Sequence, residues 1–216
     1  DQAEKLRELV TAKRRNDPEA GKTGDENQDP KGNESKIHHA GSSTKVIAVT
    51  SGKGGVGKSN FTVNLAIELS KLGNRVMIFD ADLGLANVDI IFGINPRYNL
   101  THVIREERSI KDIITETEYG VKLIASGSGV KELANLSNTQ REKFISQLAE
   151  VEDMVDVLLI DTGAGISKNT LSFIAASDYG IVITTPEPTA LMDAYGLIKV
   201  VSLSKDAVPL KLIVNM

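Results

Sequence analysis

From Thr44 onward, short apolar and β-branched runs alternate with stretches in which apolar residues recur at helical spacing. This spacing predicts helices near 58–72, 138–150, 168–177 and 189–204. The runs VLLI and IVIT are apolar throughout, as expected of strands that are covered on both faces. The alternation predicts an α/β fold: a doubly wound, mostly parallel sheet with helices on both faces and right-handed crossovers. The predicted strands are Val46–Thr50, Arg75–Phe79, Val121–Ala125, Val157–Ile160, Tyr179–Thr184 and Leu210–Val214.

Two segments of different character precede this region. Residues 1–15 place apolar side chains at helical spacing between acidic and basic ones, which predicts a short amphipathic helix. A helix this short is marginal in water alone, so we expect it to order against a partner. Residues 16–43 carry too few apolar side chains to offset the entropy of ordering, so we expect a disordered, flexible linker. Residues 44–216 form the predicted folded domain, and we expect that its C-terminal part is missing because the chain stops after a strand-like run.

Composition narrows the functional classes. The formal net charge of −4 argues against a broad basic surface, so we do not expect nucleic acid as a partner. The chain has no cysteine, which excludes disulfides, thiolate zinc sites and iron–sulfur ligation by these residues. No apolar run approaches the ~20 residues that a membrane helix needs, and no secretory leader is visible. We therefore expect a cytoplasmic protein.

The first predicted strand leads into a glycine-rich segment, SGKGGVGKS, that has the spacing of a P-loop. Glycines let the backbone turn its N–H groups toward phosphate oxygens, and the helix that follows adds its positive dipole end. Lys58 would supply a point charge at the β- and γ-phosphates, and the Ser59 hydroxyl would ligate magnesium. The alternative is a glycine-rich turn that matches by coincidence, which the flanking strand and helix disfavour. The predicted cofactor-binding residues here are Gly54, Gly55, Val56, Gly57, Lys58, Ser59 and Asn60.

Three aspartates follow two other predicted strands. Asp80 and Asp82 end the second strand, and Asp161 ends the apolar run VLLI in the manner of a Walker B motif. Carboxylates at the carboxyl ends of parallel strands lie on the ligand side of the sheet. Asp161 would there hold a magnesium-bound water. Two alternatives stay open: Asp80 or Asp82 caps the following helix, and Asp161 is a buried strand-end aspartate without a metal.

The earlier lysine of GKGGVGKS, Lys53, makes the loop resemble the deviant Walker motif of the MinD/ParA class, which belongs to the SIMIBI class of P-loop NTPases. The resemblance implies ATP bound with Mg²⁺, an ATP-dependent homodimer, and Lys53 acting on the partner's nucleotide. It further implies that Asp82 orients the attacking water, that Asp80 lies near the magnesium shell, and that Asn215 contacts the adenine edge. A solvated loop lysine and a turn asparagine are the corresponding alternatives.

Within this class, three stretches resemble the FlhG family (also called FleN or YlxH). They are DQAEKLR at residues 1–7, DTGAGIS at 161–167 and PEPTALMDAY at 186–195. Most of the MinD class has proline where this chain has Gly163, and the glycine is associated with this subgroup. The resemblance implies an ATPase that regulates flagellar number and placement.

The same resemblance implies several partners. The N-terminal segment would stimulate the SRP-type GTPase FlhF through Gln2, Leu6 and Arg7. Flagellar basal-body components are further expected partners. Membrane association at the inner face of the cell membrane is implied through a C-terminal helix that this chain does not contain. The alternatives are a division-site or chromosome- or plasmid-partitioning ATPase, and an interaction module in which ATP only controls presentation of the N-terminal helix.

Overall fold

The computed structural model describes residues 44–82, 87–127, 147–148, 150–151 and 154–216. The predicted N-terminal helix and the linker lie outside the described residues, and so do Gln2, Leu6 and Arg7. Most of the helix predicted near 138–150 also lies outside them. The predicted domain organisation therefore stays a prediction.

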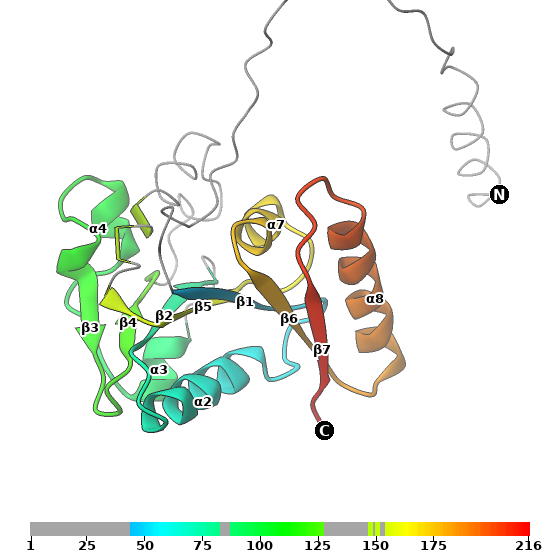
Figure 1. The fold of residues 1–216 in the computed structure, drawn as a ribbon, viewed down its shortest axis with the longest axis horizontal. Helices are drawn as coiled ribbons and strands as arrows, with labels where there is room; N and C mark the ends of the chain where they lie inside the picture. The colour runs from blue at the N-terminus through cyan, green and yellow to red at the C-terminus, as the bar shows by residue number, and fades with distance from the viewer. Residues whose placement is uncertain (1–43, 83–86, 128–146, 149, 152–153) are drawn as a thin grey trace, which may run out of the picture. The chain divides into compact units, whose positions relative to one another are not determined.

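A seven-stranded sheet in the order β3-β4-β2-β5-β1-β6-β7 forms the centre of the described domain (Figure 1). Only β3 and β4 pair antiparallel, and each of the other neighbouring strands pairs parallel. The topology confirms the predicted α/β class with a mostly parallel sheet. The strands are β1 (Lys45–Ser51), β2 (Val76–Ala81), β3 (Ile114–Glu116), β4 (Lys122–Ile124), β5 (Val157–Thr162), β6 (Tyr179–Thr184) and β7 (Leu210–Val214).

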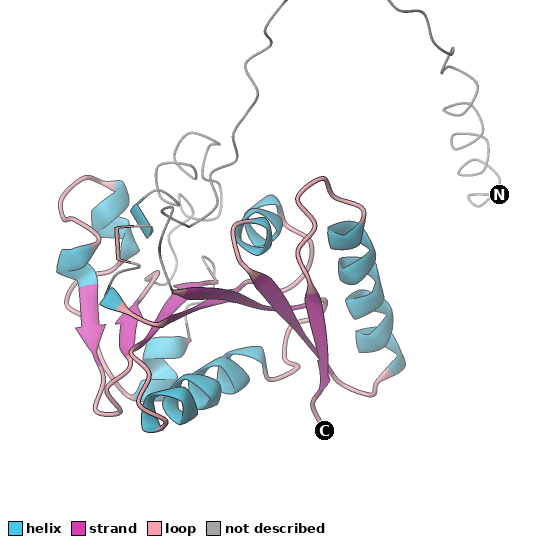
Figure 2. Ribbon diagram, viewed as in Figure 1, coloured by secondary structure: helices cyan, strands magenta, loops and turns pink. Residues whose placement is uncertain are grey.

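Helices cover both faces of this sheet (Figures 1 and 2). Alternate residues of β1 face opposite ways, so that Ile47 and Val49 pack with α2 and α3, whereas Val46 and Ala48 pack on the side of α4, α7 and α8. The buried β strands are thus apolar on both faces, as the uninterrupted runs predicted. The described helices are α2 (Lys58–Lys71), α3 (Val88–Phe92), α4 (Leu100–Ile104), the 3₁₀ turn η1 (Lys111–Ile113), α7 (Lys168–Ala175) and α8 (Pro188–Ser202).

All six predicted strands form, with ends that differ by up to two residues. The sequence patterns missed β3, α3 and α4, which are three to five residues long and too short to show a period. A local signal for α4 exists in Asn99, whose side chain accepts a hydrogen bond from the N–H of Thr101 at 3.0 Å. His102 Nδ1 in turn accepts the N–H of Asn99 at 3.2 Å, which completes a capping box.

The sheet order brings the three site-bearing strands together. β5 lies between β1 and β2, so Asp161 on β5 is paired in register with Asp80 on β2 and with Val49 on β1. Parallel strands end at the same edge of the sheet, and the loop after β1 leads directly into α2. The phosphate-loop residues and the strand-end carboxylates are therefore neighbours at one edge.

Candidate functional site

The loop between β1 and α2 turns through two left-handed glycines. Gly55 has φ +81° and Gly57 has φ +90°, a region that residues with a side chain rarely adopt. Gly57 is also the N-cap of α2, so Lys58 and Ser59 begin the helix with N–H groups that lack intrahelical partners. This arrangement presents donors and a positive dipole end toward the space above the loop, as a phosphate-binding loop requires.

Lys58 and Asp161 form a buried ion pair. Lys58 Nζ lies 2.8 Å from Asp161 Oδ1, and the two side chains are 8% and 1% exposed. Thr62, one helical turn after Lys58, places its hydroxyl 3.1 Å from the same Oδ1. The other carboxylate oxygen, Oδ2, is buried and has no hydrogen-bond partner among the described residues. Because a buried polar atom without a partner is costly, Oδ2 marks a position where a further donor or a hydrated cation fits.

Asp80 is 1% exposed and receives hydrogen bonds from three backbone N–H groups. Oδ1 accepts from Asp82 at 3.1 Å, and Oδ2 accepts from Asn87 at 3.2 Å and Val88 at 3.3 Å. Burial raises the pKa of Asp80 to about 7, the charge of Asp161 adds to this rise, and the three N–H groups oppose it. The bonds from Asn87 and Val88 place Asp80 at the N-terminus of α3, which is the capping arrangement that the sequence left open. Its role near magnesium stays a prediction.

The side chain of Asp82 lies next to Gly163, in the loop that follows β5. A Cβ added at Gly163 would lie 3.6 Å from Asp82 Oδ1, so the carboxylate flanks the loop that follows Asp161. Residues 83–86, which continue the segment after Asp82, lie outside the described residues. The water-orienting role of Asp82 stays a prediction.

Lys53 contacts its own chain in this structure. Its Nζ lies 3.0 Å from Glu187 Oε2 and 3.2 Å from Thr189 Oγ1, at the start of α8. The side chains of Lys53 and Glu187 are 41% and 64% exposed. No local sequence signal pairs Lys53 with Glu187, which lies 134 positions away.

Gly52 fixes the distance between this loop and α8. A Cβ added at Gly52 would overlap the backbone of Asp193 and Ala194, so only glycine fits between the loop and the helix. The phosphate loop therefore touches α8 twice, through the backbone at Gly52 and through the side chain of Lys53.

Asn215 lies against the phosphate loop. Its Nδ2 donates to the carbonyl oxygen of Val56 at 3.0 Å, and its backbone N–H donates to the carbonyl of Thr184 at 2.7 Å. A Cβ added at Gly57 would overlap the Asn215 amide. The predicted adenine-recognition residue is thus adjacent to the predicted phosphate site, and its contact with a base stays a prediction.

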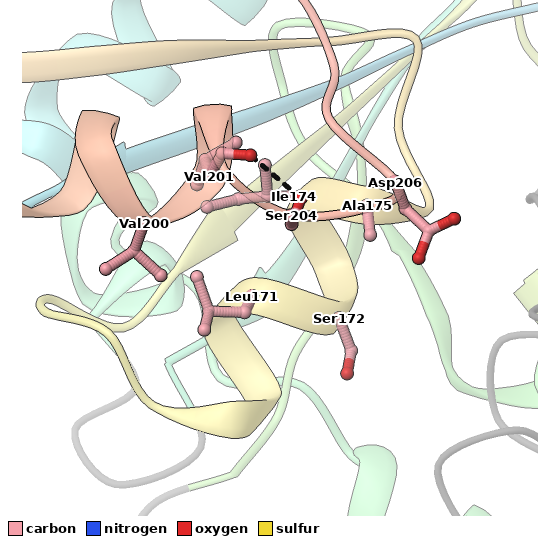
Figure 3. A pocket seen from close by; sticks show the side chains of 8 residues that line it. All are labelled: Leu171, Ser172, Ile174, Ala175, Val200, Val201, Ser204 and Asp206. Carbon is pink, nitrogen blue, oxygen red and sulfur yellow. Dashed lines mark hydrogen bonds between the residues drawn. The ribbon is translucent and has the colours of Figure 1, made fainter. Parts of the chain in front are cut away.

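A separate pocket opens between α7 and α8 (Figure 3). Leu171, Ile174 and Val201 line it with apolar side chains, and Asp206 lies at its edge. None of its lining residues belongs to the predicted nucleotide site. Among the described residues, no helix is long and apolar enough to cross a membrane, and no cluster of three or more acidic, histidine or cysteine side chains forms a metal cage.

Comparisons with known proteins identify close relatives. The chain is 45% identical over 174 residues to the flagellum site-determining protein YlxH of Helicobacter pylori, covering 80% of this chain and 58% of that protein. It is 41% identical over 172 residues to the antiactivator FleN of Pseudomonas aeruginosa, covering 80% and 61%. These relatives confirm the resemblance to the FlhG family. The chain spans about three fifths of their length.

A solved structure shares the fold. The septum site-determining protein MinD of Pyrococcus horikoshii, in complex with Mg-ADP, matches with a TM-score of 0.70 and 25% identity over 79% of this chain and 70% of that one. A family model described as ParA, NUBPL iron-transfer P-loop NTPase, matches residues 42–216. That match covers the whole described domain, and the chain therefore belongs to the ParA family of P-loop NTPases.

Proposed function

We propose that this chain is a MinD-like ATPase that binds ATP with Mg²⁺, hydrolyses it as a nucleotide-sandwiched homodimer and regulates the number and placement of flagella. The buried contact between Lys58 and Asp161, with Asp161 Oδ2 left without a partner among the described residues, carries the ATPase part. A lysine and a free carboxylate oxygen beneath a left-handed glycine loop match the needs of a polyphosphate and its hydrated cation.

The residues present fit Mg²⁺. This cation usually keeps several waters and takes one or two carboxylates together with substrate phosphates, so a cage of three acidic side chains is not required. Asp161 Oδ2 would hold a metal-bound water, the Ser59 hydroxyl would ligate the ion directly, and Asp80 lies beside Asp161 in register. When bound, Mg²⁺ neutralises charge that develops on the β- and γ-phosphates.

The chain's own residues then divide the work. Backbone N–H groups from Gly54 to Asn60 would surround the phosphates, and Lys58 would exchange Asp161 for the β- and γ-phosphate oxygens. Asp82 would orient the attacking water. Catalysis then rests on positioning and charge stabilisation, as phosphoryl transfer generally requires.

Lys53 completes the partner's site in this proposal. Its contact with Glu187 is solvent-exposed, and exposed ion pairs contribute only about 0–1 kcal/mol. Lys53 can therefore leave Glu187 at little cost when a second protomer presents a nucleotide. ATP would favour the dimer and hydrolysis would release it, which makes the protein a switch.

The flagellar role is supported by the relatives. Identity to the flagellum site-determining protein and to the antiactivator is 45% and 41%, against 33% to the septum site-determining protein MinD of Synechocystis and 36% to that of Thermotoga maritima. We extend the proposal to stimulation of the GTPase FlhF by residues 1–15, with basal-body components as further partners. We also extend it to peripheral association with the inner face of the cell membrane. The chain has no cysteine, so no iron transfer is proposed for it.

ATP hydrolysis and dimerisation can be tested together on the full-length protein. We expect phosphate release that depends on Mg²⁺ and is lost in Lys58→Ala, and a dimer by light scattering when Asp82→Ala is saturated with Mg-ATP. Lys53→Ala should lower hydrolysis, whereas Lys71→Ala, which removes another exposed lysine paired with a glutamate, should not. A monomeric Asp82→Ala protein at saturating Mg-ATP would refute the dimer.

The partner claim needs its own experiment. GTP hydrolysis by FlhF is measured with and without a synthetic peptide of residues 1–15. We expect stimulation that is lost when Gln2 and Arg7 are changed to alanine and kept when Lys13 is changed instead. If FlhF responds to a known activator but not to this peptide, the partner claim is wrong. The chain would then be a division-site or a partitioning ATPase. Salt-sensitive binding to DNA would then favour partitioning.

A further inference from the structure

The hydroxyl of Thr62 is the second donor to Asp161. Thr62 lies on α2, is 0% exposed, and places Oγ1 3.1 Å from Asp161 Oδ1 and 3.0 Å from the carbonyl oxygen of Lys58. A hydroxyl has a single proton to donate, and a carboxylate is the stronger acceptor. The geometry therefore favours a charge-assisted bond from Thr62 to Asp161.

The two carboxylate oxygens of Asp161 are used differently. Oδ1 accepts from both Lys58 and Thr62, whereas Oδ2 has no partner in the described part of the chain. Lys58 and Thr62 are the two side chains that donate to Oδ1, so when Lys58 moves to a phosphate, Thr62 still holds this oxygen. A carboxylate held by one oxygen keeps the other oriented.

We propose that Thr62 is a positioning residue for the magnesium site: its hydroxyl holds Asp161 Oδ1 on the α2 side so that Oδ2 stays available to the hydrated cation throughout the nucleotide cycle. The inference rests on the proposed function. Groups that hold a metal ligand in place typically change metal affinity or activity by about 10- to 100-fold when they are removed.

A merely structural role for Thr62 predicts a different outcome. Thr62→Val keeps the shape and removes the hydroxyl, so a packing role would survive the change. Thr50 offers a matched control, because it is also 0% exposed, lies at the end of β1 beside the phosphate loop, and its hydroxyl has no partner among the described residues. Thr50→Val should leave the magnesium site unchanged.

The test measures binding of fluorescently labelled ADP to the full-length protein over a range of Mg²⁺ concentrations and in EDTA. Thr62→Val should raise the Mg²⁺ concentration for half-maximal binding about 10-fold, while affinity in EDTA stays at the wild-type value. Thr62→Ser should restore the wild-type Mg²⁺ dependence. If valine prevents folding, Thr62→Ala serves in its place.

Each contrary outcome has a distinct meaning. An unchanged Mg²⁺ dependence in Thr62→Val, an equal loss with and without Mg²⁺, or the same shift in Thr50→Val would overturn the role of Thr62. A wild-type protein that binds the nucleotide without any Mg²⁺ dependence would instead overturn the proposed function.

Discussion

The phosphate loop carries two lysines that meet carboxylates in opposite surroundings. Lys58 forms a buried ion pair with Asp161 at the carboxyl ends of the strands. Lys53 forms a solvent-exposed ion pair with Glu187 at the start of α8. Both Nζ atoms lie within 3.0 Å of a carboxylate oxygen, so distance does not distinguish the pairs. Burial does, because solvent screens one charge pair and not the other.

This difference determines what each lysine can do. A buried charge cannot lose its partner unless another charge takes its place, and nucleotide phosphates can do this for Lys58. An exposed lysine leaves its partner at little cost, which suits a side chain that must reach another protomer. The loop therefore combines one lysine tied to the fold with one that is free to move.

Removing the buried lysine charge should have the largest effect. Lys58→Met leaves Asp161 buried without its cation, and we expect the free energy of unfolding to fall by about 3–5 kcal/mol without nucleotide. Urea denaturation measures this value. The double variant Lys58→Met with Asp161→Asn should recover much of the loss, and Lys53→Met should cost at most about 1 kcal/mol. Equal losses in the two single lysine variants would contradict the comparison.

The contact between Gly52 and α8 is the next most sensitive feature. Gly52→Ala forces a Cβ into the backbone of Asp193, and overpacking of this kind typically costs about 1–3 kcal/mol. Nucleotide affinity should fall with it, because the loop shifts away from α8. Gly196→Ala on the same helix meets no atom within 4 Å and should be neutral or stabilise by up to about 1 kcal/mol. Thermal melts and nucleotide titrations of both variants provide the measurement.

Asp80, a buried carboxyl paired in register with Asp161, should make the stability of the protein depend on pH. A carboxyl whose pKa is about 7 when folded and near 3.8 otherwise binds its proton more tightly in the folded state. Stability should therefore fall as pH rises between these values, by at most about 1.4 kcal/mol per pH unit for one group. Urea denaturation in EDTA from pH 5 to pH 8 measures the slope. Asp80→Asn should make the free energy of unfolding less dependent on pH. If the variant keeps the wild-type slope, other titratable groups cause the pH dependence.

The exposed pair should give the smallest change. Glu187→Ala releases Lys53 and should change the free energy of unfolding by less than about 1 kcal/mol. The variant should dimerise in ATP at the wild-type protein concentration or at one up to about fivefold lower, which light scattering measures. Glu68→Ala, which removes the exposed partner of Lys71, is the matched control and should leave dimerisation unchanged. Weaker dimerisation in Glu187→Ala would show that Glu187 supports Lys53 in the dimer.

The sequence predicted features that repeat or have fixed local spacing. The six strands follow from apolar runs, and the glycine loop with Lys58 and Ser59 follows from its spacing. The pairing of Lys58 with Asp161 could be expected from the strand ends, since parallel strands end at one edge. The position of Thr62 one turn after Lys58 was a usable signal, because residues four apart share a helix face.

Other features had no such signal. The short antiparallel strand β3 has no visible period, and the pairing of Lys53 with Glu187 depends on how α8 approaches the loop. The contact between Asn215 and Val56 likewise joins residues 159 positions apart. Long-range side-chain contacts of this kind follow from the packed fold and not from local pattern.

The position of β5 between β1 and β2 also has a consequence for synthesis. Lys58 is made 103 residues before Asp161, and at about 5–20 residues per second this interval lasts roughly 5–20 seconds. During that time β1 and β2 have no strand between them, because each pairs with β5. The emerging chain thus cannot bring the loop and its carboxylate together, or close the centre of the sheet, before β5 has been made.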